Sequence, residues 1–381
     1  MSEKTENENA KKEIDDKSVN EKETEEKELS LLEALAKKES QVKGEIPVEL
    51  LKKRKAKVKR RRKKISPFQV LKIALLIWLI VMAGLTFTAY SLENQVTTQL
   101  NSANITLIDG FNKLLSGNLT SAESSFLSAY SKYKAVEATI SNLNLLVRVN
   151  PVLQISFMLN PQITYELDFR RALVRAGIIM SISGNISISA LISCKHAFGS
   201  LIDKNISSAI HYFSLSNTTL ITILTYFDIA RNTIQEIDPI SLTKEDSDIY
   251  ITVVNFIHNM TLFFEDWDRL AQINIQFSQG LSYILDGLSY LQNEKFDQAK
   301  SVIQNANDLL IKANSSFWNN PPTYLNDFWH IMLAAITYLI VSIHTIQDGA
   351  NNFQAEPYYT LAMNNVSLAM QELALAYSLF E

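Results

Sequence analysis

The sequence predicts an all-α protein with a disordered N-terminal tail, one transmembrane helix and an extracytoplasmic helical domain. Three observations lead to this fold class. The charges fall into separate blocks, one uncharged run is long enough to cross a bilayer, and the remaining apolar residues recur at helical intervals with only 10 Gly and 8 Pro in 381 residues.

The tail, residues 1–50, carries 9 Lys or Arg against 15 Asp or Glu. Its first 28 residues contain almost no apolar side chains and cannot bury enough surface to offset the entropy of the chain. We therefore expect residues 1–50 to form a disordered, acidic cytoplasmic segment of mixed charge.

A polybasic segment follows at residues 51–65, with 11 basic residues and no acidic one. By composition alone it could bind nucleic acid or a membrane surface. Because an apolar run follows at once, binding to anionic lipid headgroups is favoured, at about 1 kcal/mol per basic residue near such a surface, over binding to nucleic acid. The candidate membrane-binding residues are Lys52, Lys53, Arg54, Lys55, Lys57, Lys59, Arg60, Arg61, Arg62, Lys63 and Lys64.

A transmembrane helix is predicted over residues 70–90, because the eighteen residues from Ile73 to Tyr90 carry no charge. About 20 apolar residues in a helix span the hydrocarbon core. Lys72 lies at the basic end, where its side chain can reach the headgroups, and Tyr90 suits the opposite interface. Basic residues crowd the N-terminal flank, and the first one beyond the run is Lys113. This bias places the N-terminus in the cytoplasm and residues 91–381 outside it.

The N-x-S/T sequons agree with this orientation, since all of them follow the predicted span. We expect N-linked glycans on the extracytoplasmic domain, which together with an Ile-rich core and few cysteines is typical of an archaeal cell surface. The candidate glycosylation sites are Asn104, Asn118, Asn185, Asn205, Asn217, Asn259, Asn314 and Asn365.

A second uncharged run of eighteen residues extends from Trp329 to Ile346. It could be a second span, but no Lys or Arg follows it, and it contains two histidines, His330 and His344. A buried helix of the domain is the preferred interpretation. A second ambiguity concerns residues 181–189, SISGNISIS, where a β-hairpin competes with a helix and the helix is preferred.

Beyond the span, residues 91–381 should form antiparallel helical hairpins. One apolar stripe precedes the break at residues 116–118, and a second follows it. The first consists of Leu92, Val96, Leu100, Ile105, Ile108, Phe111 and Leu115, with Leu107 and Leu114 on the same face. The second consists of Leu119, Ala122, Phe126, Ala129, Tyr133, Val136, Ile140 and Leu143. So short a break forces the two helices into an antiparallel pair.

The sequence at this break recurs along the chain. LLSGNLTSAESSFLSA begins at Leu114, LIDKNISSAIHYFSLS at Leu201 and LQNEKFDQAKSVIQNA at Leu291, and a fourth copy from Phe353 aligns with one inserted residue. The pattern resembles the turn and second helix of tetratricopeptide-like (TPR-like) hairpins over about sixteen residues per copy. This resemblance implies an α-solenoid-like domain or an irregular bundle that binds other proteins.

No catalytic or metal-binding motif is recognisable, so we expect no enzyme activity and no cofactor. The single cysteine, Cys194, is expected to be a buried thiol. An acidic cluster at residues 263–270, FFEDWDRL, is either a polar helix face or a partner-binding patch.

The favoured function is a non-catalytic scaffold or accessory subunit of a membrane or cell-envelope protein complex, located in the cell membrane. Two alternatives remain: extracytoplasmic binding of a solute, peptide or glycan, and tethering of nucleic acid to the membrane by the basic segment.

Overall fold

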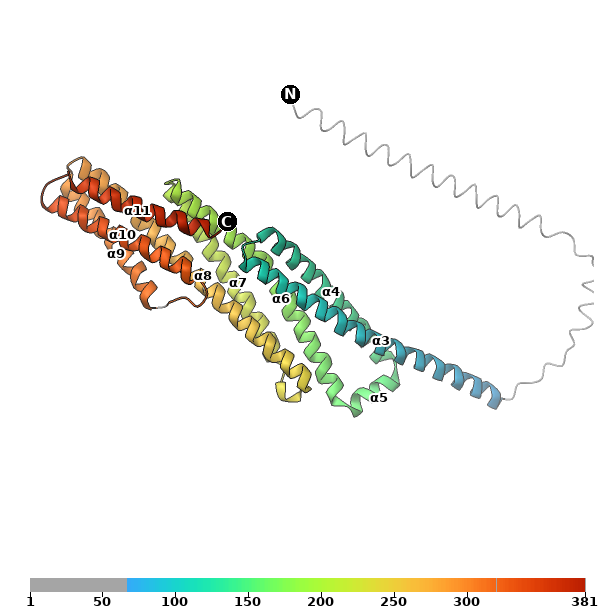
Figure 1. Cartoon of the computed structure of the whole chain (residues 1–381). Helices are drawn as coiled ribbons and strands as arrows, with labels where there is room; N and C mark the ends of the chain where they lie inside the picture. The colour runs from blue at the N-terminus through green and yellow to red at the C-terminus, as the bar shows by residue number, and fades with distance from the viewer. Residues whose placement is uncertain (1–66, 320, 381) are drawn as a thin grey trace, which may run out of the picture. The chain divides into compact units, whose positions relative to one another are not determined.

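The computed structural model describes residues 67–319 and 321–380, so residues 1–50 and 51–65 lie outside the described part. The described residues form nine α-helices, one short 3-10 helix and no strand (Figure 1). The prediction of an all-α fold is confirmed. The chain divides into residues 1–78 and 79–381, and the packing below concerns the second unit. The helices are α3 Pro67–Leu115, α4 Leu119–Val149, α5 Pro151–Leu159, α6 Pro161–Ile202, α7 Ile206–Gln235, η1 Pro239–Ser241, α8 Lys244–Gln292, α9 Phe296–Asn319, α10 Asn326–Asn351 and α11 Tyr358–Ser378.

Most helices pair as antiparallel hairpins, α3 with α4, α6 with α7, α8 with α9 and α10 with α11 (Figure 1). Helix α6 packs on α4 and α7, α8 packs on α7 and α9, and α10 packs on α9 and α11. Helix α11 returns to contact α6. The two long helices α6 and α8 therefore connect the α3–α4 hairpin to the C-terminal hairpins.

Three of the four recurring turns share one backbone geometry. Gly117, Lys204 and Glu294 occupy equivalent positions with φ of 78°, 59° and 54°. In each case the next residue donates its backbone N–H to the carbonyl five residues earlier, as in a Schellman motif. These hydrogen bonds run from Asn118 to Lys113 at 2.9 Å, from Asn205 to Ser200 at 2.8 Å and from Lys295 to Tyr290 at 2.8 Å.

The fourth turn differs from the predicted alignment. Its left-handed residue is Phe353, with φ of 52°, so Phe353 matches Gly117 instead of Leu114. Leu119 lies two residues after Gly117, whereas Tyr359 lies six residues after Phe353, so the fourth copy has four inserted residues and not the one that was predicted. The second helix nevertheless buries Ala362 and Ala369 at the expected positions.

Residues 181–189 lie inside α6, so the preferred helix is confirmed and the β-hairpin is wrong. Gly184 has a packing role. A Cβ atom at this position would overlap the ring of Phe126, which also lies against Gly110 of α3. A Cβ atom at Gly177 would likewise overlap the ring of Tyr133. Two aromatic rings of α4 thus occupy places that a side chain on α6 would fill.

The α4 stripe is confirmed from Ala122 to Leu143, whereas the α3 stripe is partly wrong. Ile105, Ile108 and Leu115 are 69%, 46% and 50% exposed. The buried face of α3 follows steps of three or four residues, which turns those three side chains away from α4. From residue 96 onward, the buried residues of α3 are Val96, Leu100, Ala103, Leu107, Phe111 and Leu114.

Three described helices, α3, α6 and α10, are long and apolar enough to cross a membrane, where the sequence predicted one. Their most apolar windows are 6%, 61% and 50% buried, respectively. Helix α6 was not predicted from the sequence as a candidate span, although no charge occurs between Ala176 and Cys194. The predicted helix at Trp329–Ile346 is confirmed within α10, and it buries one face.

Candidate functional site

Helix α3 exposes a continuous run of large apolar side chains. From Leu75 to Val81 every side chain is between 46% and 63% exposed. A soluble protein rarely leaves so much contiguous apolar surface uncovered. This run falls within the predicted span, and Phe87 and Tyr90 continue it at 75% and 64% exposure.

Next to this part of α3, the connection between α4 and α5 is fixed by Asn150. The side chain is fully buried, and its Nδ2 donates to Thr86 Oγ1 at 3.2 Å and to the Met82 carbonyl at 3.4 Å. Its Oδ1 accepts the Val152 N–H at 3.0 Å and caps α5. One asparagine therefore positions α5 beside residues 82–86.

A cavity of about 170 Å³ lies between α3, α4, α5 and α6. Leu153 and Phe157 of α5 line it together with Ala89 and Tyr90 of α3. Glu93 and Arg170 add polar groups, with 3.7 Å between Oε1 and Nη1. The lining is otherwise largely apolar, so the cavity suits an aliphatic group better than a polar solute.

A larger cavity, of about 440 Å³, lies between α3, α4, α6 and α8. Tyr133 donates its hydroxyl to Asn104 Oδ1 at 2.7 Å in the wall. Burial raises the pKa of Tyr133, so this phenol is a neutral donor. Glu245 and Asp248 also line the space. The apolar wall consists of Leu107, Ile108, Met180, Ile249, Val253 and Phe256.

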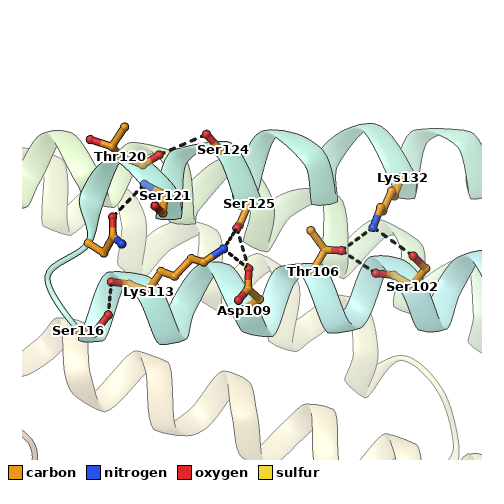
Figure 2. A network of polar contacts seen from close by, with 11 residues as sticks. Ser102, Thr106, Asp109, Lys113, Ser116, Thr120, Ser121, Ser124, Ser125 and Lys132 are labelled. Carbon is orange, nitrogen blue, oxygen red and sulfur yellow. Dashed lines mark hydrogen bonds and ion pairs between the residues drawn. The ribbon is translucent and has the colours of Figure 1, made fainter.

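Polar side chains tie α3 to α4, as Figure 2 shows. Lys113 Nζ donates to Asp109 Oδ2 at 2.6 Å and to Ser125 Oγ at 3.0 Å, and Ser125 donates to the same carboxylate at 2.8 Å. The hydrogen bond from Lys113 lowers the pKa of Asp109. Lys113, Asp109 and Ser125 are therefore each hydrogen-bonded to the other two. The arrangement stabilises the hairpin.

A second contact in Figure 2 joins the same two helices. Lys132 Nζ donates to Thr106 Oγ1 at 2.6 Å and to Ser102 Oγ at 3.1 Å. Both hydroxyls belong to α3 and the lysine to α4. Together with the Asp109 cluster, this contact fixes the register of the hairpin through side chains near its surface.

Three candidate glycosylation sites are exposed. Asn118 and Asn205 are the N-caps of α4 and α7, where Oδ1 accepts the backbone N–H of Ser121 and Ser208, each at 3.2 Å. Capping occupies the oxygen and not the nitrogen that carries a glycan. Asn259 is exposed on α8.

The other five sequons lie on helices and are less accessible. Asn217 Nδ2 donates to Asp268 Oδ1 at 2.7 Å, and Asn365 Nδ2 donates to the Leu361 carbonyl at 3.1 Å. Asn185 has a buried Oδ1 with no hydrogen-bond partner, whereas that of Asn104 accepts from Tyr133. Asn314 is half-buried.

The acidic cluster on α8 is largely interior, which corrects the prediction of a polar face or partner-binding patch. Asp266 is fully buried, and its Oδ2 accepts the backbone N–H groups of Thr323 and Tyr324 at 2.7 Å and 2.9 Å. Arg269 donates to Oδ1 at 2.5 Å. Trp267 is only 7% exposed. The cluster therefore fixes the connection between α9 and α10.

The part of the chain that the structure describes contains no group of three or more His, Cys, Asp or Glu able to hold a metal ion. Cys194 is buried as expected, with Sγ 3.1 Å from Ser216 Oγ. The eleven basic membrane-binding candidates at residues 52–64 lie outside the described residues.

No protein-family model matches the chain, and no curated protein or solved structure is significantly similar to it. The resemblance to TPR-like hairpins therefore rests on the turn sequences.

Proposed function

We propose that the chain is a membrane-anchored, non-catalytic scaffold or accessory subunit of a membrane or cell-envelope complex. The observation that carries the proposal is the difference in burial among three apolar helices. The most apolar 18-residue stretch of α3 is 6% buried, whereas the corresponding stretches of α6 and α10 are 61% and 50% buried. Lipid can cover the exposed side chains of α3, while α6 and α10 bury much of their apolar surface within the protein.

Polar side chains on α10 also favour a single span. His330 and His344 are both exposed on this helix. A lipid-facing α10 would place two imidazoles in or near the hydrocarbon region without a visible partner, which is costly. With α3 as the anchor, the basic flank lies in the cytoplasm against anionic headgroups, and the helical bundle and its sequons lie outside.

A regular apolar stripe on α11 supports binding to another protein. Leu361, Leu368 and Leu375 recur every seven residues and are 54%, 38% and 54% exposed. Leucines at this spacing form one line along a helix and can pack against a helix of a partner. The groups that could support chemistry, such as Lys113 and Asp266, are engaged in contacts that hold helices together.

The proposal is tested by purifying the full chain from native membranes in mild detergent, with crosslinking before extraction. A defined set of partners should copurify, and Leu361→Glu with Leu368→Glu and Leu375→Glu should release them while the chain stays in the membrane. The control carries Leu215→Glu and Ile229→Glu on the exposed side of α7, where the original side chains are 47% and 45% exposed. Repeated recovery of a lone monomer would contradict the subunit function.

The 440 Å³ cavity favours a second candidate, the binding of an apolar or amphipathic solute. Ile108→Trp should fill the cavity and abolish binding of a fluorescent hydrophobic probe. Ile105→Trp is the matched control, because Ile105 is on the same helix and does not line the cavity. Equal binding to both variants would exclude this cavity as the binding site.

A further inference from the structure

Helix α5, Pro151–Leu159, is apolar and yet contributes no buried residue. Ile155 is 56% exposed, and Met158 and Leu159 are 81% and 80% exposed. No charged residue occurs from Val149 to Tyr165. Solvation of these side chains by water is unfavourable, so this surface requires an apolar environment.

The contacts of α5 place it beside the outer half of the predicted span. Asn150, directly before α5, donates to Thr86 and Met82 of α3. Leu153 and Phe157 share a cavity wall with Tyr90. Since α3 exposes Phe87 and Tyr90 at this level, the apolar surface of α5 continues the apolar surface of the span.

The two sides of α5 differ. Leu153 and Phe157, four residues apart, pack against the core, whereas Ile155, Met158 and Leu159 are exposed. With a rise of 1.5 Å per residue, α5 extends about 14 Å, which is too short to cross the hydrocarbon core. Its length and its one exposed apolar side fit a helix that lies in the plane of the interface.

We propose that α5 is an interfacial helix that inserts its exposed apolar side chains into the outer leaflet next to α3. The occupant of this surface is lipid, at the boundary between headgroups and acyl chains. The absence of charge over residues 149–165 and the continuity with the exposed side chains of α3 argue for lipid over a protein partner. The inference rests on the proposed membrane anchoring, and it gives the bundle a second attachment to the bilayer.

The test uses the full chain with one added cysteine, reconstituted in vesicles of three parts phosphatidylcholine to one part phosphatidylglycerol. Met158→Cys is labelled with a polarity-sensitive fluorophore, and quenching by nitroxide lipids is measured at shallow and deep acyl positions. Met158 is exposed, so the substitution should leave the fold intact, and the buried Cys194 should not be labelled. Two controls are Ile80→Cys, 63% exposed in the span, and Leu127→Cys, 53% exposed on α4.

The inference predicts that the label at residue 158 is quenched most by shallow nitroxides, the label at residue 80 by deep ones, and the label at residue 127 by neither. Quenching at residue 80 without quenching at residue 158 would overturn the interfacial role of α5 and leave the anchor intact. No quenching at either position would overturn the membrane anchoring itself. Equal quenching at residues 127 and 158 would also overturn the inference, because it would show non-specific adsorption of the bundle.

Discussion

Helices α3 and α6 are similar in hydropathy but differ in their environment. Both are long and apolar enough to cross a membrane, yet their most apolar stretches are 6% and 61% buried. The α3 run consists largely of Leu, Ile, Val and Trp, whereas α6 buries Ser183, Gly184, Ser187 and Ala190 among its apolar residues. Small residues allow neighbouring helices to approach closely. Side-chain size therefore distinguishes the two helices better than hydropathy does.

The largest effects should follow from placing lysine in each helix. Ile77→Lys with Ile80→Lys in α3 should prevent membrane insertion at a cost of about 3 kcal/mol per lysine, with the bundle still folded. Ala190→Lys in α6 should unfold the bundle, because Ala190 is fully buried and an unpaired buried charge costs several kcal/mol. Alkaline extraction of membranes and thermal unfolding distinguish the two results. Loss of insertion with an intact fold in Ala190→Lys would mean that α6 faces lipid.

A smaller effect should follow from adding one methyl group at a glycine of α6. Gly184→Ala would overlap the ring of Phe126 and should reduce the free energy of unfolding by about 1–3 kcal/mol. Gly199→Ala in the same helix meets only Tyr377 Cε2 at 3.6 Å, an ordinary contact, and should increase stability by up to about 1 kcal/mol through helix propensity. Denaturant titration measures both. Equal changes in the two variants would contradict close packing at Gly184.

These contacts mark the limit of prediction from sequence. Periodicity correctly placed the α4 stripe, and the recurring sequence correctly placed three of the four turns, because both depend on residues close in the chain. It could not reveal that Phe126 contacts both Gly110 and Gly184, since that contact joins three helices. Similarly, the burial of Asp266 could not be predicted, because its hydrogen-bond partners are the backbone N–H groups of residues 323 and 324, which are distant in the sequence. No prediction was made for α5, because residues 151–159 alone do not show whether an apolar helix is buried or exposed.

The smallest expected effect concerns Asp268 on α8. This residue makes polar contacts within the bundle, whereas the exposed run of α3 from Leu75 to Val81 has only apolar side chains. Asp268 accepts hydrogen bonds from Asn217 Nδ2 at 2.7 Å and from Gln272 Nε2 at 2.8 Å. Burial raises the pKa of Asp268 above its ordinary value, and these hydrogen bonds oppose the shift.

Because the folded chain holds this proton more tightly than the unfolded chain, the contribution of Asp268 to stability is complete below the ordinary carboxyl pKa of about 3.9. It is lost as the pH rises through the raised pKa. As the pH rises from about 4, the loss of this contribution should lower the unfolding midpoint of the wild-type chain. The midpoint of Asp268→Asn should fall less over the same pH range. Asp286→Asn, at an exposed position farther along α8, is the matched control, and only Asp268→Asn should change the pH dependence. Identical pH profiles for the wild-type and Asp268→Asn chains would show that Asp268 is as well solvated as a surface carboxylate.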